Sequence, residues 1–417
     1  MRFVTLLFAV AVAAPLGAAE KVAPAARPAP KAAEKPPAKA EEAAPAPPAA
    51  LPLEKLILPP GFKVALYANV KGARSMALGA KGTVFVGTRD NSGTVYAVVD
   101  KDKDGKADSV APFATGLDRP NGVAFKDGAL YVGEKTRIVR YDAAEDHLTG
   151  APAPAVFADG HPQGQQHGFR YMAFGPDGWL YVGMGAPCNI CDHEKDEPRL
   201  ASITRVSADG KKEEVFARGV RNTVGFDWDP VTKFLWFTDN GRDWLTDDYP
   251  NVPSDELNRA HRKEIHFGYP FCHQGDIPNP GKLETTLKGR DMSVDAPADA
   301  CEHYEAPALK LDPHVAALGM KFYTGSMFPA EYKNAIFIAQ HGSWNREPQP
   351  KTGYRVMVAR PEEKGEKRYQ PFLTGFLDGQ KAWGRPVDVL VMPDGALLLS
   401  DDSAGALYRI TYEAPKP

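Results

Sequence analysis

The chain has 417 residues and a formal net charge of −3, from 50 basic and 53 acidic side chains. This balance leaves no electrostatic footprint for nucleic acid and no polybasic patch for anionic membranes, so we expect a small or local ligand. Beyond residue 50 the chain is long enough for two average domains or one large all-β domain.

The N-terminal segment has the features of an exported protein. Residues 1–19 combine one arginine, an apolar run and small residues suited to cleavage, which predicts a secretory signal peptide. Residues 20–50 lack aromatic side chains and bury little apolar surface, so we expect a disordered Ala/Pro-rich linker. A wall-spanning or partner-docking arm is the alternative for this linker. The mature protein is expected to be soluble, and periplasmic or secreted.

A short motif recurs over residues 51–417: an apolar strand, a glycine-containing turn and a second apolar strand. Its six copies are MALGAKGTVFVGTRD (76–90), VAFKDGALYVGE (123–134), MAFGPDGWLYVGMG (172–185), FDWDPVTKFLWFTDNG (226–241), MKFYTGSMFPAEYKNAIFIAQHG (320–342) and VLVMPDGALLLSDD (389–402). Strands rich in Val, Tyr, Phe and Ile, joined in places by Asp-Gly, are typical of β-hairpins. Six copies predict an all-β, six-bladed β-propeller, closed beside the last copy by FKVALYAN near Phe62. Helical periodicity is absent between the strands, which argues against an α/β fold.

The spacing of the repeat almost doubles between the fourth and fifth copies. The extra segment, about His266–His314, is expected to form loops. Long insertions in a propeller lie over one face, where ligands bind.

Four cysteines in an exported protein predict two disulfides, with three possible connectivities. We favour Cys188–Cys191 and Cys272–Cys301, because each pair staples one loop. A redox-active CxxC motif is the alternative for the first pair, but the sequence predicts no helix after its first cysteine. Haem attachment requires a histidine at the position of Asp192.

Three loops carry side chains suited to chemistry. His167, with His161 as a second candidate, precedes the third repeat, where an imidazole suits general-base work near neutral pH. Arg221 beside Asn222 can grip a carboxylate bidentately. The turn at Thr238–Trp244 exposes backbone carbonyls next to acidic residues, as a hard-cation site requires. The simpler interpretations are a loop histidine bonded to backbone and an arginine paired with a surface carboxylate.

A separate acidic loop follows the first repeat. Asp100, Asp102, Asp104 and Asp108 alternate with other residues around Gly105, a spacing that can wrap one Ca²⁺. The twelfth-position Glu of an EF-hand is missing, so the loop predicts a structural calcium site within the propeller. A solvated acidic turn is the alternative.

Together and in this order, the motifs resemble those of the PQQ-dependent soluble glucose/sorbosone dehydrogenase family, where PQQ is pyrroloquinoline quinone. The resemblance runs from about Leu53 to Tyr412. It rests on His167 ahead of FGPDGWLYVG (174–183), Arg221-Asn222, the DNGR turn (239–242), DELN (255–258) and HFGYP (266–270). The sorbosone dehydrogenase-like branch is more similar, judged by GAPCNIC (185–191), HGSWNR (341–346) and GRPVDV (384–389).

The resemblance implies PQQ lying over the central channel of a six-bladed propeller. His167 would take the proton of the substrate hydroxyl while hydride passes to the quinone. Arg221 and Asn222 would stabilise quinone oxygens and cofactor carboxylates. The backbone carbonyls of Gly241 and Arg242 would hold a catalytic calcium.

Further arginines are expected to meet the three carboxylates of PQQ, because a trianionic ligand needs convergent cations. Arg385 matches a cofactor-binding arginine of the family. The fifth-blade lysine of the glucose enzymes has no match here, and Arg346 is the proposed substitute beside His341. The family's Gly-Asp is Gly185-Ala186 in this chain, which removes a carboxylate that would orient the base.

The resulting functional hypothesis is an exported, PQQ- and calcium-dependent dehydrogenase. Its substrate would be a sugar or alcohol, oxidised at an aldose-type hydroxyl or a hydrated aldehyde. The electron acceptor, a cytochrome or the quinone pool, is left open. The alternatives are a calcium-dependent propeller lactonase, which needs acidic or Asn ligands converging on the channel, and a non-catalytic exported binding propeller.

Overall fold

The computed structural model describes residues 51–89, 93–162, 167–243, 252–279, 294, 296–344, 346 and 349–414. The expected signal peptide (1–19) and linker (20–50) lie outside these ranges. Within them, no helix combines the length and apolarity needed to cross a membrane.

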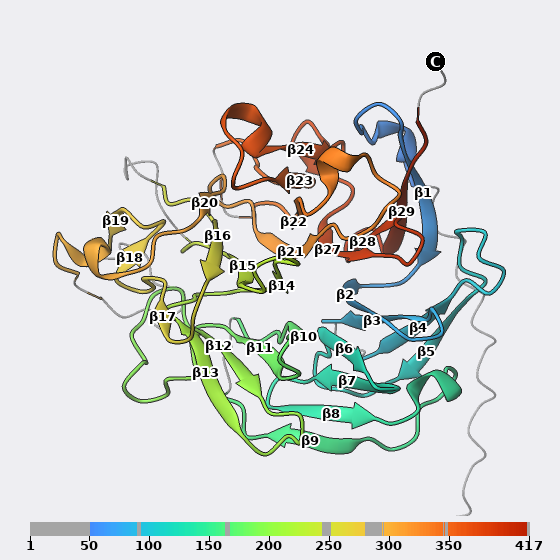
Figure 1. Ribbon diagram of the computed structural model, residues 1–417, viewed down its shortest axis with the longest axis horizontal. Helices are drawn as coiled ribbons and strands as arrows, with labels where there is room; N and C mark the ends of the chain where they lie inside the picture. Colours follow the sequence, from blue (N-terminus) through green and yellow to red (C-terminus); the bar gives the residue numbers. More distant parts are fainter. Residues whose placement is uncertain are drawn as a thin grey trace, which may run out of the picture. The chain divides into compact units, whose positions relative to one another are not determined.

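Six sheets succeed one another around a ring, which confirms the all-β, six-bladed propeller (Figure 1). The first strands of neighbouring sheets lie toward the middle of the ring and contact one another, as β2 does with β6 and β27. The first sheet comprises β2 (Ala73–Leu78), β3 (Val84–Thr88), β4 (Val95–Val99) and β5 (Ser109–Ala114). The second comprises β6 (Gly122–Lys126), β7 (Ala129–Gly133), β8 (Arg137–Tyr141) and β9 (Ala155–Asp159). The third comprises β10 (Met172–Phe174), β11 (Leu180–Met184), β12 (Ser202–Val206), β13 (Glu213–Arg218) and the parallel edge strand β17 (Ile265–His266). The fourth comprises β14 (Phe226–Trp228), β15 (Leu235–Asp239), β16 (Glu256–Ala260) and β20 (Leu309–Lys310). The fifth comprises β21 (Ala317–Phe322), β22 (Ile336–Gln340), β23 (Arg355–Ala359) and β24 (Tyr369–Leu373). The sixth comprises β27 (Pro386–Val391), β28 (Leu397–Asp401), β29 (Ala406–Tyr412) and β1 (Phe62–Asn69).

The ring closes through its N-terminal strand, as expected. β1 pairs antiparallel with β29, with Phe62 opposite Tyr412. The last sheet therefore combines both ends of the propeller sequence, and residues far apart in the chain meet where it faces the first sheet.

The insertion between the fourth and fifth repeats is more structured than the expected loop. It contributes β17 and β20 to the edges of two sheets and forms a small hairpin. Both favoured disulfides, Cys188–Cys191 and Cys272–Cys301, are present. The remaining short elements are β18 (Cys272–His273), β19 (Ile277–Pro278), β25 (Leu377–Asp378), β26 (Lys381–Ala382), and the 3-10 helices η1 (Leu53–Lys55), η2 (Ala144–Asp146), η3 (Ala300–His303), η4 (Ala330–Tyr332) and η5 (Gly365–Arg368).

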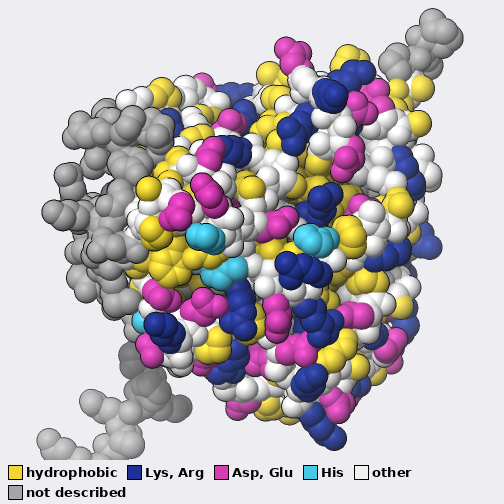
Figure 2. All heavy atoms as spheres, turned by 60° about the vertical axis from the view of Figure 1, so that its left-hand side comes forward, with side chains coloured by type: hydrophobic (Ala, Val, Ile, Leu, Met, Phe, Trp, Pro, Cys, Tyr) yellow, Lys and Arg dark blue, Asp and Glu magenta, His cyan; other side chains and the backbone are white. Residues whose placement is uncertain are grey.

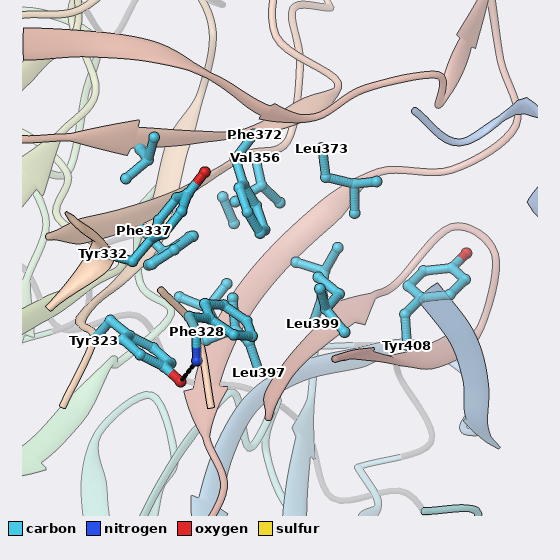
Figure 3. Close-up of a cluster of buried hydrophobic side chains, with 14 of the residues drawn as sticks. Tyr323, Phe328, Tyr332, Phe337, Val356, Phe372, Leu373, Leu397, Leu399 and Tyr408 are labelled. Atoms are coloured by element: carbon cyan, nitrogen blue, oxygen red, sulfur yellow. Dashed lines mark hydrogen bonds between the residues drawn. The ribbon is translucent and has the colours of Figure 1, made fainter. Parts of the chain in front are cut away.

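Local sequence explains the blades. At the Asp127-Gly128 hairpin both residues have positive φ, 50° and 79°, which matches the twist of the flanking strands and favours this pair. Between the fifth and sixth sheets, aromatic rings pack edge to face, as Phe337 and Phe372 do with centroids 4.7 Å apart (Figure 3). The buried Tyr323 hydroxyl accepts a hydrogen bond from the backbone N–H of Phe328 at 2.9 Å, so its polar end is satisfied.

The surface carries both charges. On the face shown in Figure 2, Lys and Arg side chains alternate with Asp and Glu rather than forming a patch of one sign. This distribution agrees with the small net charge, and the described part of this face carries no basic patch of the kind that binds nucleic acid.

Candidate active site

A cavity of about 590 Å³ is built mostly from the loops that precede the first strand of a blade or follow its second strand, with Arg74 and Leu318 added from the starts of the first strands β2 and β21. In an antiparallel blade these loops meet at the same end. The volume lies within the range common for small-molecule sites. The lining residues are Arg74, Arg89, His167, Phe169, Arg221, Asn222, Val224, Asn240, Gly241, Asp243, Asp255, His314, Ala316, Leu318, His341, Gly342, Trp344 and Arg385.

Five of the residues predicted from the sequence come together in this cavity: His167, Arg221, Asn222, Gly241 and Arg385. They come from four different loops. Convergence of His, Arg and Asn at one end of the ring is the arrangement that the motifs predicted.

Arg221 lies in the loop between β13 and β14 and is only 3% exposed. Its guanidinium donates to the backbone and side-chain oxygens of Asn189 at 3.0 and 2.9 Å, to the Asn240 carbonyl at 3.1 Å and to Asp243 Oδ2 at 3.0 Å. This network fixes the orientation of the planar fork, so its cavity-facing side is pre-organised for an anion.

The neighbouring turn after β15 is locked to Arg221 and Asn222 through one buried carboxylate. Asp239 accepts hydrogen bonds from the backbone N–H groups of Arg221 and Asn222, at 2.8 and 2.6 Å. The carbonyl of Asn222 in turn accepts from Asn240 Nδ2 at 2.9 Å. Asn240 Oδ1 is buried and has no hydrogen-bond partner among the described residues. An orphaned, buried amide oxygen next to the Gly241 turn fits a cation or another donor supplied by a ligand.

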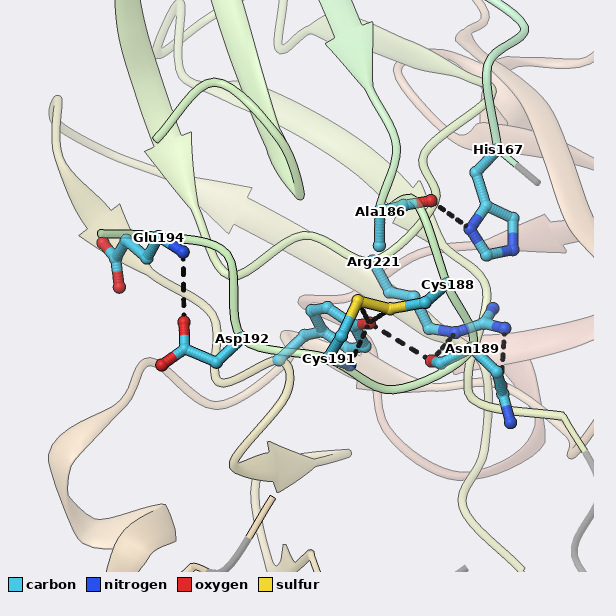
Figure 4. Close-up of a disulfide and its surroundings, with 9 residues drawn as sticks. His167, Ala186, Cys188, Asn189, Cys191, Asp192, Glu194 and Arg221 are labelled. Atoms are coloured by element: carbon cyan, nitrogen blue, oxygen red, sulfur yellow. Dashed lines mark hydrogen bonds between the residues drawn. A yellow bond between two sulfur atoms is a disulfide. The ribbon is translucent and has the colours of Figure 1, made fainter. Parts of the chain in front are cut away.

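His167 is oriented by a backbone carbonyl. Its Nδ1 lies 2.8 Å from the Ala186 oxygen, which can only accept, so Nδ1 carries the hydrogen and Nε2 keeps its lone pair (Figure 4). The carbonyl therefore performs the orienting role of the missing carboxylate. Burial, assisted by the charge of Arg221, lowers the pKa of His167 to about 3, which keeps the imidazole neutral at physiological pH.

The opposite wall contains a cationic group that the sequence did not reveal. Arg74 is 2% exposed and pairs with Asp402 at 3.0 Å. The charge of Arg74, with burial, lowers the pKa of the cavity-lining Arg89. Arg74 lies in β2 and Arg89 directly follows the paired strand β3, so an anion bound beside them would offset the repulsion between the two guanidinium groups.

His341 also lines this wall and has a carboxylate partner. Its Nε2 lies 2.8 Å from Asp402 Oδ1. Burial lowers the pKa of His341 to about 4. Burial alone would raise the pKa of Asp402, but the adjacent His341 and Arg74 hold this pKa well below its usual range. Arg385 donates to the carbonyls of His341 and Gly342 at 3.1 and 2.7 Å, which fixes its fork beside them.

Two further buried carboxylates, Asp255 and Glu256, belong to the segment that follows the Gly241 turn. Asp255 accepts the Gly241 N–H at 2.9 Å, and burial raises its pKa to about 6. Burial and the charge of Asp239 raise the pKa of Glu256 to about 8. A cation held by the carbonyls of this turn would offset the negative charge that these groups develop.

Three predicted residues do not line the cavity. Arg242 is buried, and its Nη1 donates to Asn279 Oδ1 at 2.5 Å, so only its backbone remains a candidate ligand. Arg346 donates through Nε to the Pro350 carbonyl and is not among the lining residues. His161 is 3% exposed, with its Nε2 3.9 Å from Glu213.

The acidic loop separates three of its carboxylates from the fourth. Asp100, Asp102 and Asp108 place one oxygen each within 4.8 Å of the others. Asp104 is not part of this cluster, and its Oδ1 accepts the Lys106 N–H at 2.8 Å. Asp100 Oδ1 is buried without a hydrogen-bond partner among the described residues. The loop is thus compatible with a three-carboxylate cation site that leaves out Asp104.

Arg74, Arg89, His314 and His341 were not predicted as site residues. A signal for two of them was present, because Arg89 and His341 directly follow the second strand of their repeat. Asn240 occupies the same position after β15. Aligning the repeats at this position would have identified both.

Comparisons with known proteins identify the family and the fold. A sequence profile described as TrAA12-like matches residues 56–413. An uncharacterized protein of Borreliella burgdorferi is 33% identical over 374 residues, covering 86% of this chain and 91% of that protein. A pyrroloquinoline quinone-dependent pyranose dehydrogenase of Coprinopsis cinerea is 26% identical over 196 residues, covering 39% of this chain but only 26% of that protein. The calcium structure of a Trichoderma reesei carbohydrate-active enzyme of family AA12 has a TM-score of 0.71 at 18% identity, covering 86% of this chain and 97% of that chain. The resemblance expected from the motifs is confirmed.

Proposed function

Since the chain belongs to the TrAA12-like family, we propose that it is an exported dehydrogenase that oxidises a sugar with PQQ and calcium. The observation that carries this proposal is the cavity itself. Arg74, Arg89, Arg221 and Arg385 all line it. Four guanidinium groups around one small space fit a compact polyanion, and PQQ carries three carboxylates.

Two of these arginines are already oriented by backbone or amide oxygens. Arg221 is held by Asn189 and Asn240, and Arg385 by the carbonyls of residues 341 and 342. The acceptors of Arg385 are neutral carbonyls, whereas Arg221 also pairs with the Asp243 carboxylate at 3.0 Å. An anionic ligand would therefore gain fully from the charge of Arg385 and in part from that of Arg221. Arg346 stays a weaker candidate, because it lies outside the lining residues.

Proton transfer is assigned to His167. Its Nε2 lone pair is fixed by the hydrogen bond from Nδ1 to Ala186, and the neutral form is maintained by burial. A bound anion would offset the charge of Arg221, the second cause of the lowered pKa after burial, and would so make His167 more basic. This residue would accept the proton of the sugar hydroxyl; when bound, PQQ would supply the hydride acceptor and calcium a Lewis acid.

The catalytic calcium would be held by the backbone carbonyls of Gly241 and Arg242, with support from the oxygen-rich wall. Asn240, Asp243 and Asp255 line the cavity around this turn. Oxygen ligands of this kind are those that Ca²⁺ prefers. The cluster of Asp100, Asp102 and Asp108 would hold a second, structural calcium.

The substrate is proposed to be an aldose-type sugar or a hydrated aldehyde, with a cytochrome or the quinone pool as the electron acceptor. The signal peptide expected at residues 1–19 would place the enzyme in the periplasm or outside the cell.

Mixing the purified protein with PQQ and Ca²⁺ tests the proposal. A dehydrogenase acquires a quinone absorption band and then reduces an artificial dye when sugar is added. A calcium-dependent lactonase would instead hydrolyse lactones with Ca²⁺ alone, and a binding propeller would do neither. The arginine-rich lining favours the first outcome.

A further inference from the structure

The geometry points to Asn189, enclosed by the Cys188–Cys191 disulfide, as the residue that positions both Arg221 and the Gly241–Arg242 turn. The inference rests on the proposed function, because these two elements are the ones assigned to the cofactor and its calcium. The disulfide closes a four-residue loop with Asn189 inside it (Figure 4). Asn189 is fully buried.

Asn189 uses both of its oxygens on Arg221. Its backbone carbonyl accepts from Arg221 Nε at 3.0 Å, and its Oδ1 accepts from Arg221 Nη2 at 2.9 Å. One residue therefore holds two nitrogens of the guanidinium, as a carboxylate does, but without adding a negative charge. Asn189 thus orients the arginine without neutralising it, and the carboxylate paired with the guanidinium is that of Asp243, at 3.0 Å.

The same amide also fixes the calcium turn. Asn189 Oδ1 accepts the backbone N–H of Asp243 at 2.8 Å, and Nδ2 donates to the Asp243 carbonyl at 3.1 Å. Asp243 directly follows Arg242, so this pair of bonds holds the C-terminal end of the turn, while Asp255 holds the Gly241 N–H. Arg221 and the proposed calcium ligands are therefore set relative to each other through one side chain.

The disulfide fixes the backbone of this loop. Both cysteines are nearly fully buried. The Tyr269 hydroxyl donates to the Asn189 carbonyl at 3.2 Å and accepts from the Cys191 N–H at 3.2 Å. The loop also extends to the proposed base, because Ala186 accepts from His167 and donates its N–H to the Arg221 carbonyl at 2.8 Å.

Asn189→Ala tests this role. Losing a hydrogen bond to a charged group should weaken PQQ affinity, measured by absorbance titration at saturating Ca²⁺, by roughly ten- to a hundredfold. The Ca²⁺ affinity of the apo protein, measured by calorimetry, should fall as well. Tyr269→Phe is the milder variant and should weaken PQQ binding by roughly fivefold. The double variant Cys188→Ser/Cys191→Ser should also weaken PQQ binding.

The matched control is Cys272→Ser/Cys301→Ser, which removes the disulfide outside the loop that contains Asn189. It should lower the melting temperature and leave the PQQ affinity of the folded protein within about threefold, since loss of a disulfide acts mainly on stability. A merely structural role for Asn189 would give this same pattern in Asn189→Ala.

A crystal structure of the apo Asn189→Ala protein separates this inference from the proposed function. The expected result is an Arg221 side chain displaced from its wild-type position. Unchanged PQQ affinity in the three variants, with Arg221 still in place, would overturn the inference. If wild-type protein bound no PQQ, the proposed function would fail, while the position of Arg221 would still decide the role of Asn189.

Discussion

Replacing His167 by alanine should abolish most turnover and leave the scaffold intact. General-base catalysis typically contributes 10²–10⁴-fold, so kcat should fall by roughly that factor. The ring makes one identified hydrogen bond, to Ala186, whose loss should lower the free energy of unfolding by only about 1 kcal/mol. PQQ affinity should stay within a few-fold of wild type, because the arginines provide the main anion contacts.

The assay is dye reduction by the PQQ- and Ca²⁺-loaded variant, with single-turnover kinetics to isolate the chemical step. His161→Ala is the control. His161 is buried but does not line the cavity, so its loss should lower the melting temperature and leave kcat within a few-fold. Wild-type-like dye reduction by His167→Ala would refute the assignment. A large loss of kcat confined to His341→Gln would transfer the base role to the imidazole paired with Asp402.

The other predictions concern charge, pH and metal. Arg221→Lys keeps the charge but loses the planar fork, so PQQ affinity should fall by roughly tenfold or more in absorbance titrations; unchanged affinity would make this arginine purely structural. Burial raises the pKa of Asp388 to about 6, against about 4 when unfolded, so its folded form binds the proton more tightly and stability falls as pH rises from about 4 to about 6. In denaturant titrations, Asp388→Asn should reduce the loss of unfolding free energy between these two pH values by up to about 3 kcal/mol. An unaltered dependence of the unfolding free energy on pH would contradict this prediction. Chelation should lower the melting temperature, and Asp102→Asn/Asp108→Asn should make this decrease smaller, whereas Asp104→Asn should not. Ca²⁺ at a hundred times its Kd should contribute about 2.7 kcal/mol to the free energy of unfolding.

Much of the fold was predictable because the repeat is local. Each copy carries its own hairpin, as in Asp127-Gly128, and six copies specify the number of blades. Cavity-lining residues that lie within one sequence motif, such as Arg221 and Asn222, were also predictable from the sequence. The inserted strand β17 was missed, because two residues paired in parallel with β13 have no periodicity of their own.

The other wall of the cavity depends on ring closure, which no single motif contains. Arg74 and Asp402 are separated by 328 positions and meet only where the first and last blades adjoin. Arg346 shows the opposite case: a cationic residue in a recognisable motif whose guanidinium is bonded to the Pro350 carbonyl, outside the cavity lining. The sequence motifs predicted several of the loops that line the cavity, but not which way each side chain points.

The central claim is that this cavity holds PQQ and uses it to oxidise a sugar. Anaerobic single-turnover titration tests it most directly: the protein is loaded with PQQ and Ca²⁺, and aldoses are added without an electron acceptor. We predict stoichiometric binding of one PQQ per chain and its complete reduction by one equivalent of a suitable sugar. In the chelated protein we expect neither PQQ binding nor PQQ reduction. Failure to bind PQQ at micromolar concentrations in the presence of Ca²⁺, or binding without reduction by any aldose or aldehyde, would contradict it.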